Sequence, residues 1–108
     1  EALQRTRAFD ERAVLLQRSG RLGTFPSSLG QEAVFVGTAA AMQPEDIYCP
    51  YYRDQGALLL RGTSPVTLFR YWGGHEDGNF DPNNPNDLPN CVPIASQCTH
   101  AVGIAYAL

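Results

Sequence analysis

Tyr52 and Arg53 are the pair of residues in this chain whose types and spacing best suit anion binding. They follow a short apolar run at 47–49 and a proline, and they precede a helical run that ends at Gly62. This pattern predicts a strand, a sharp turn and a helix. Backbone amides at a helix start, a forked guanidinium and a phenolic hydroxyl are all donors to phosphate oxygens. The pair is therefore a candidate phosphate site, with a solvated or salt-bridged arginine as the alternative.

A second junction of the same kind lies near the end of the sequence. Residues 91–94 predict another short buried strand, and an alanine-rich helix follows Gln97. Ligands of open α/β sheets collect at the carboxyl ends of the strands, so the two junctions together predict a site for a phosphate-bearing cofactor. An ordinary βα unit without a ligand is the alternative.

The loop at 73–90 is rich in glycine, proline and asparagine, and it contains a third group of reactive side chains. His75, Glu76 and Asp77 stand at its start, where they could serve as metal ligands or in proton transfer. A long loop of this kind is typically functional or disordered. A solvated loop cluster is the alternative for these three residues.

Four further helical segments must position these groups. An amphipathic helix is predicted at 1–19, ending at Gly20, and a second is predicted up to about Met42. The second is nearly all apolar, so we expect it to be buried. Its start carries a capping-box pattern, Ser28 with Gln31. The third runs to Gly62, and Ser64 followed by proline predicts the start of the fourth.

These elements predict an α/β fold, with helices around short parallel strands, in one domain. The 108 residues are 44% hydrophobic, which is enough for a core, and the net charge of −3 gives no case for nucleic acid or an anionic membrane surface. Three cysteines without metal-ligand spacing predict a reducing compartment. No apolar run approaches a membrane span. We expect a soluble, cytoplasmic protein, and a piece of a longer one, since both ends look helical and uncapped.

Several motifs, in their order and spacing, resemble one family over essentially the whole chain. They are Arg18-Ser19-Gly20-Arg21-Leu22-Gly23, Gly30-Gln31-Glu32-Ala33, Tyr52-Arg53 and the run from Ile94 to Gly103. The chain resembles the amino-terminal part of the α subunit of the thiamine-diphosphate-dependent E1 component of 2-oxo acid dehydrogenase complexes. Its Phe-Pro-Ser-Ser loop is more similar to bacterial pyruvate-type chains than to branched-chain ones. Residues 1–108 are then a partial thiamine-diphosphate-binding domain.

The resemblance implies roles for individual residues. Tyr52 and Arg53 would contact the cofactor diphosphate. Val92 and Ile94 would offer main-chain groups to the aminopyrimidine ring, and the bulk of Ile94 would support the bent cofactor. His75 would lie near the substrate or lipoyl entrance, where we assign it as the candidate catalytic residue. His100 is expected to be a packing residue.

Two metal ions are also implied. In branched-chain relatives the last junction cradles a potassium ion through positions that match Cys91, Pro93, Ser96 and Gln97. Cys91 stands where a serine is common, so a backbone carbonyl would have to serve there. Mg²⁺ would bridge the diphosphate to the protein, but the family's magnesium motif is expected just past Leu108. The 108 residues alone are therefore expected to bind the cofactor weakly and to be inactive.

The implied reaction is oxidative decarboxylation of a 2-oxo acid, pyruvate being favoured, with transfer of the acyl unit to a lipoyl group on E2. The implied partners are an E1 β subunit, in an α2β2 heterotetramer, and the lipoyl domain of E2. Neither nucleic acid nor a membrane is expected as a partner. Two alternatives stay open: the α subunit of an acetoin dehydrogenase, and a non-catalytic helical interaction domain.

Overall fold

Helices make up the regular structure of the chain, all 108 residues of which are described by a computed structural model. Five are α-helices, and a short 3₁₀ helix, η1, lies between the last two. Their order is α1 (Ala2–Arg18), α2 (Glu32–Ala41), α3 (Gln55–Leu60), α4 (Pro65–Trp72), η1 (Glu76–Asn79) and α5 (Ser96–Ala107). None of these helices combines the length and apolarity that a membrane crossing requires.

The prediction of an α/β fold with short parallel strands is wrong for these residues, because the structure contains no strand. The strand predicted at 47–49 is reduced to one parallel bridge between Tyr48 and Asp87. In it the Tyr48 amide donates to the Asn86 carbonyl at 2.8 Å, and the Leu88 amide donates to the Tyr48 carbonyl at 2.9 Å. The strand predicted at 91–94 is absent. A strand is stable only when a neighbour pairs with its backbone groups, and 91–94 has no such neighbour here.

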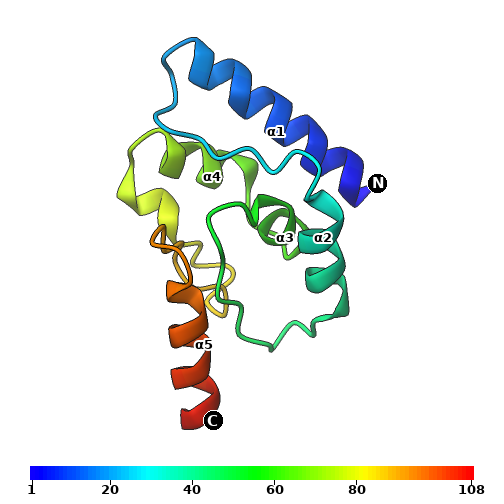
Figure 1. Cartoon of the computed structure of the whole chain (residues 1–108), viewed down its shortest axis with the longest axis vertical. Helices are drawn as coiled ribbons and strands as arrows, with labels where there is room; N and C mark the ends of the chain where they lie inside the picture. Colours follow the sequence, from blue (N-terminus) through cyan, green and yellow to red (C-terminus); the bar gives the residue numbers. More distant parts are fainter.

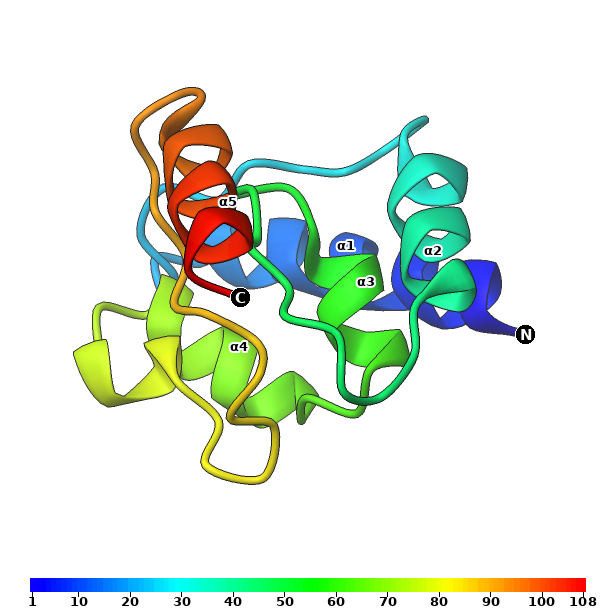
Figure 2. The ribbon, with the colours of Figure 1, turned by 90° about the horizontal axis from the view of Figure 1, so that it is seen from below.

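Figure 1 shows α1 lying across α2 and α3, with α4 beside them and α5 projecting away at the carboxyl-terminal end. Helix α1 packs on both α2 and α3, α2 packs on α3, and η1 packs on α4. Helix α5 buries none of its residues. In both views the chain between α2 and α3 passes beside α5 (Figures 1 and 2).

The core forms where α1, α3, α4 and the loop between α1 and α2 meet, and its aromatic part lies between α1, α4 and that loop. Phe9 of α1 stacks on Phe69 of α4 with ring centroids 4.5 Å apart, and Phe25 of the loop meets the Trp72 ring edge-on at 5.8 Å. Aromatic side chains contribute a large share of the apolar area that a small core buries. The core therefore fixes the loop that follows α1, and this loop reaches the candidate site.

Local signals predicted the helix ends with mixed success. Gly20 has the expected left-handed backbone, with φ of +73°, and the Ser64 side chain accepts from the amide of Val66 as a helix cap. The capping box of Ser28 and Gln31 is wrong, because α2 begins without a side-chain cap and the Ser28 hydroxyl donates to Asp10 instead. The expected burial of α2 is also wrong, since most of its residues are exposed in this chain.

Candidate cofactor-binding site

The turn that presents Tyr52 and Arg53 is closed around one carboxylate oxygen. Asp54 Oδ2 accepts from the Tyr48 hydroxyl at 2.6 Å and from the backbone amide of Tyr51 at 2.7 Å. The Asp54 residue is only 5% exposed. Because both donors are themselves part of the turn, the backbone on either side of Tyr52 and Arg53 is held in one conformation.

Arg53 is held by neutral groups. Its Nη1 donates to the carbonyl oxygen of Ser27, and its guanidinium carbon lies 5.4 Å from the centroid of the Tyr52 ring. No carboxylate forms an ion pair with it. Of the eight arginines only Arg53 and Arg61 are half-buried, and Arg61 pairs with Asp87 at 2.5 Å. Arg53 is therefore the half-buried arginine whose charge is left for a ligand.

Tyr51 and Tyr52 place two phenol groups beside this guanidinium. Their ring centroids are 4.0 Å apart. The pKa of the Tyr51 hydroxyl is raised above its ordinary value, chiefly by the adjacent Tyr52 hydroxyl, whereas the Arg53 guanidinium acts in the opposite direction. The three groups thus form one cluster of hydrogen-bond donors that suits the oxygens of a phosphate.

The expected contribution from amides at the start of a helix is not supported. Helix α3 has only six residues, and the acidic side chain of Asp54 lies at its start. A short helix with a carboxylate at its amino end does not attract anions. The donors for an anion at this site are therefore the Arg53 guanidinium and the neighbouring phenols.

The two predicted junctions leave the Tyr48–Asp87 bridge in the same direction. Because the bridge is parallel, the segment that leads from Tyr48 to Arg53 and the segment that leads from Asp87 to Val92 and Ile94 leave it in the same direction. No hydrogen bond joins the two ends directly.

Ile94 and Val92 lie in the segment before α5. Ile94 is 79% exposed and Val92 is exposed as well. Ala95, which follows, has a left-handed backbone with φ of +67° and stands at the start of α5. A large apolar side chain in this position exposes surface that a ligand or another part of the protein can cover.

The positions predicted for potassium lie in the same segment. The Ser96 hydroxyl donates to the carbonyl oxygen of Pro93 at 2.6 Å, and Gln97 Oε1 is buried without a partner. Cys91 has a free, half-buried thiol. Hard cations prefer oxygen ligands, so the oxygens of Pro93, Ser96 and Gln97 and the backbone carbonyl of Cys91 suit such an ion by type, whereas the Cys91 thiol does not.

His75 lies apart from this cluster. It is exposed at the start of η1, and its backbone amide bonds to the carbonyl oxygen of Arg70. Asp77 forms an ion pair with the side chain of Arg70. No three His, Cys, Asp or Glu residues are grouped as metal ligands. The role of His75 stays a prediction.

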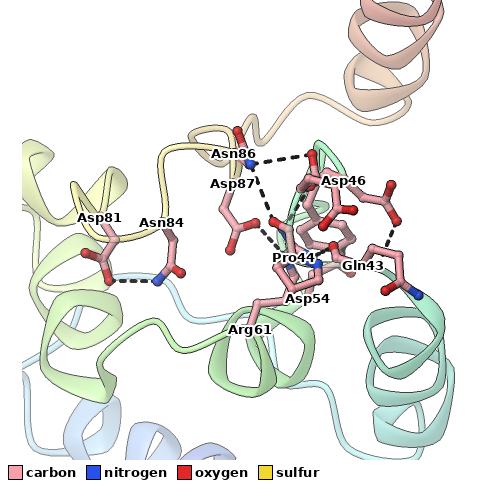
Figure 3. A network of polar contacts seen from close by, with 11 residues as sticks. Gln43, Pro44, Asp46, Asp54, Arg61, Asp81, Asn84, Asn86 and Asp87 are labelled. Atoms are coloured by element: carbon pink, nitrogen blue, oxygen red, sulfur yellow. Dashed lines mark hydrogen bonds and ion pairs between the residues drawn. The ribbon is translucent and has the colours of Figure 1, made fainter.

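Sequence reasoning missed the buried carboxylates that support the site. Figure 3 shows Asp54, Arg61 and Asp87 in one polar network, in which Arg61 also donates to the carbonyl oxygen of Asp46 at 2.9 Å. Burial raises the pKa of the Asp54 and Asp87 carboxyls, against the effect of Tyr48 on the first and of Arg61 on the second. The position of Asp54 directly after Arg53 was the one local signal that could have found it.

Residues 2–108 match the family described as "Dehydrogenase E1 component", and the chain belongs to that family. Among similar curated proteins is the pyruvate dehydrogenase E1 component subunit alpha of Acholeplasma laidlawii, 42% identical over 98 residues, which are 91% of this chain and 28% of that protein.

Two other proteins with the same name are similar over more of the chain. The one from Mycoplasma pneumoniae is 34% identical over 103 residues, and the one from Staphylococcus aureus is 36% identical over 103 residues. Each match covers 95% of this chain, but only 29% and 28% of the respective relative. The chain thus spans less than a third of the length of these relatives.

Proposed function

We propose that this chain is part of the α subunit of a pyruvate-type E1 enzyme and that Tyr52 and Arg53 hold the diphosphate of thiamine diphosphate. One observation carries the proposal: Arg53 is half-buried, lacks a carboxylate partner and is held by the Ser27 carbonyl and the Tyr52 ring. An arginine held by neutral groups keeps its full charge and most of its donors for an anion. The names of the relatives support pyruvate as the substrate.

When bound, thiamine diphosphate supplies the carbon nucleophile and the electron sink for decarboxylating a 2-oxo acid. The residues of this chain bind and orient it. Arg53 would neutralise part of the diphosphate charge, Tyr52 would donate a hydrogen bond to it, and the backbone of Val92 and Ile94 would face the aminopyrimidine ring. The exposed Ile94 side chain would then be covered by the cofactor.

The proposal extends to ions and partners. The backbone carbonyl of Cys91 and the oxygens of Pro93, Ser96 and Gln97 are the candidate potassium ligands in this chain, and the Mg²⁺ that accompanies the diphosphate would take ligands from outside these residues. An E1 β subunit, the lipoyl domain of E2 and a cytoplasmic location complete the proposal. His75 would act at the substrate or lipoyl entrance.

The test is the affinity of the full-length protein, purified with its partner subunit, for thiamine diphosphate. We expect Arg53→Ala to weaken binding by about 1.5–3 kcal/mol, or roughly 10- to 100-fold, because a charge-assisted contact is lost. Binding of thiamine itself, which has no phosphate, should change little. Arg70→Ala, at an exposed arginine paired with Asp77, is the matched control. An unchanged affinity of Arg53→Ala for thiamine diphosphate would refute the proposal.

A further inference from the structure

One peptide group joins Asp10 of α1 to Arg53 in the turn before α3. The carbonyl oxygen of Ser27 accepts from Arg53 Nη1, while the amide of Ser28, at the other end of the same peptide group, donates to Asp10 Oδ1 at 2.7 Å. All peptide bonds of the chain are trans. The carbonyl and the amide hydrogen of a trans peptide point in opposite directions, so the carboxylate and the guanidinium lie at opposite ends of one planar group.

The side chain of Asp10 forms hydrogen bonds only with the Ser27–Ser28 segment. It is 3% exposed, and besides the Ser28 amide it accepts from the Ser27 hydroxyl at 2.6 Å and from the Ser28 hydroxyl at 3.2 Å. No arginine forms an ion pair with it. A buried carboxylate is costly unless it is hydrogen-bonded, and every hydrogen bond that Asp10 receives through its side chain comes from these two serines. Its contacts therefore fix the orientation of the Ser27–Ser28 peptide.

The orientation of that peptide sets the position of Arg53. The Ser27 carbonyl is the backbone group that accepts a hydrogen bond from the guanidinium. If the peptide rotated, the carbonyl would turn away, and the guanidinium would lose the hydrogen bond that fixes its position. Hydrogen bonds in such a chain also polarise one another, so the carboxylate strengthens the carbonyl as an acceptor.

We propose that Asp10 is a positioning residue for Arg53, acting through the Ser27–Ser28 peptide to aim the guanidinium at the cofactor diphosphate. The inference rests on the proposed function, because it takes Arg53 as the diphosphate ligand. It assigns a role to the Phe-Pro-Ser-Ser loop, which joins the first helix to the site. It also explains why a carboxylate without a counter-ion is buried under that loop.

The test compares single and double variants of the full-length protein with its partner subunit. Asp10→Asn keeps the shape of the side chain but removes its charge and one acceptor oxygen, and we expect the Kd for thiamine diphosphate to rise about tenfold. In an Arg53→Ala background the same substitution should have no further effect on that Kd, since the two residues act through one contact. The Kd for thiamine without phosphates should not change in either variant.

Two further variants keep the test decisive. Ser27→Ala removes one hydroxyl contact to Asp10 and leaves the peptide in place, so it should fold if Asp10→Asn does not, and should raise the Kd about threefold. Ser64→Ala, which removes a helix cap far along the chain, is the control for a general loss of stability and should leave the Kd unchanged.

The outcomes separate the two proposals. If Arg53→Ala weakens cofactor binding but Asp10→Asn and Ser27→Ala do not, the positioning role is refuted and the proposed function stands. The role is also refuted if Asp10→Asn weakens binding as much in the Arg53→Ala background as alone. If Arg53→Ala leaves binding unchanged, the proposed function fails and this inference fails with it.

Discussion

The Tyr48 hydroxyl donates a 2.6 Å hydrogen bond to Asp54 Oδ2, the same oxygen that receives the amide of Tyr51. The other oxygen of this buried carboxylate, Oδ1, has no partner. One oxygen thus carries both contacts that hold the turn of Tyr52 and Arg53. The proposed diphosphate site depends on a bond between two side chains that need not touch the cofactor.

Replacing Tyr48 with phenylalanine should loosen this turn. The substitution keeps the ring in the core and removes one donor to a buried carboxylate, so we expect a loss of about 1.5–3 kcal/mol of stability. Hydrogen exchange at the Tyr51 amide should become faster, because its acceptor is then less well fixed. Tyr106→Phe, at a tyrosine that is 94% exposed, is the matched control and should change neither quantity. Unchanged exchange at Tyr51 in Tyr48→Phe would contradict the prediction.

Asp54 should also affect how stability depends on pH. Burial raises the pKa of its carboxyl above the ordinary value, so the folded protein binds this proton more tightly than the unfolded chain does. The stabilisation from this group is therefore greatest below the unfolded pKa and is lost as the pH rises through the folded pKa. Asp87, whose pKa is raised as well, acts in the same direction.

Asp54→Asn should remove the part of the pH dependence of stability that comes from Asp54. Its amide oxygen can take the place of Oδ2 and accept from both Tyr48 and Tyr51, so the turn is kept while the charge is lost. Unfolding midpoints measured against pH should then fall less steeply above the acid range than in the unchanged protein. Parallel profiles for the two proteins would show that Asp54 does not titrate as described.

The sequence predicted the helices well because their signals are local. The apolar stripe of α1, the cap at Ser64 and the glycine at Gly20 each act within one or two turns of helix. The strands were predicted wrongly, because an apolar run becomes a strand only with a partner, and 47–49 finds a single bridge. The capping box failed for a similar reason: the Ser28 hydroxyl is taken by Asp10, 18 residues earlier.

The same distinction applies to the site. Tyr52 and Arg53 could be singled out from the sequence because an arginine and a tyrosine at a turn suggest an anion site by type alone. Asp10 and Ser27 could not be singled out, because their roles exist only once α1 and the turn before α3 meet in space. Supporting residues of this kind follow from the fold and not from any local pattern.

Helices α1 and α3 meet at Gly56, where a larger residue should not fit. A Cβ atom at this position would lie 2.8 Å from Thr6 Cγ2 and 2.9 Å from Thr6 Oγ1. Thr6 is buried and its side chain is short and branched, so it cannot move aside easily. We expect Gly56→Ala to cost about 1–3 kcal/mol of stability by overpacking.

A second substitution tests the cause of that loss. Thr6→Ala removes both clashing atoms, so the double variant Thr6→Ala/Gly56→Ala should be more stable than Gly56→Ala alone. Thermal unfolding of the four proteins of this cycle measures the coupling. Additive losses from the two substitutions would rule out a clash with Thr6 as the reason.

The ion pair between Arg61, which follows α3, and Asp87 holds the end of that helix against the 84–87 loop (Figure 3). The two side chains are 10% and 4% exposed; Asp87 Oδ1 pairs with Arg61, and Asp87 Oδ2 has no partner. Arg61→Met would leave Asp87 buried without any cation, and this should lower the free energy of unfolding by about 3–5 kcal/mol. Asp87→Asn should cost less, since Arg61 would keep its bond to the Asp46 carbonyl.

The double variant Arg61→Met/Asp87→Leu decides whether the cost comes from the unpaired charge. With both charges gone, apolar side chains fill the same space, and we expect the protein to be more stable than Arg61→Met alone. Unfolding midpoints of Arg61→Met, Asp87→Leu and the double variant give this comparison. If the loss of stability in the double variant equals the sum of the losses in the two single variants, the two side chains are not energetically coupled. The loop must then be held by its backbone contacts at Tyr48 instead.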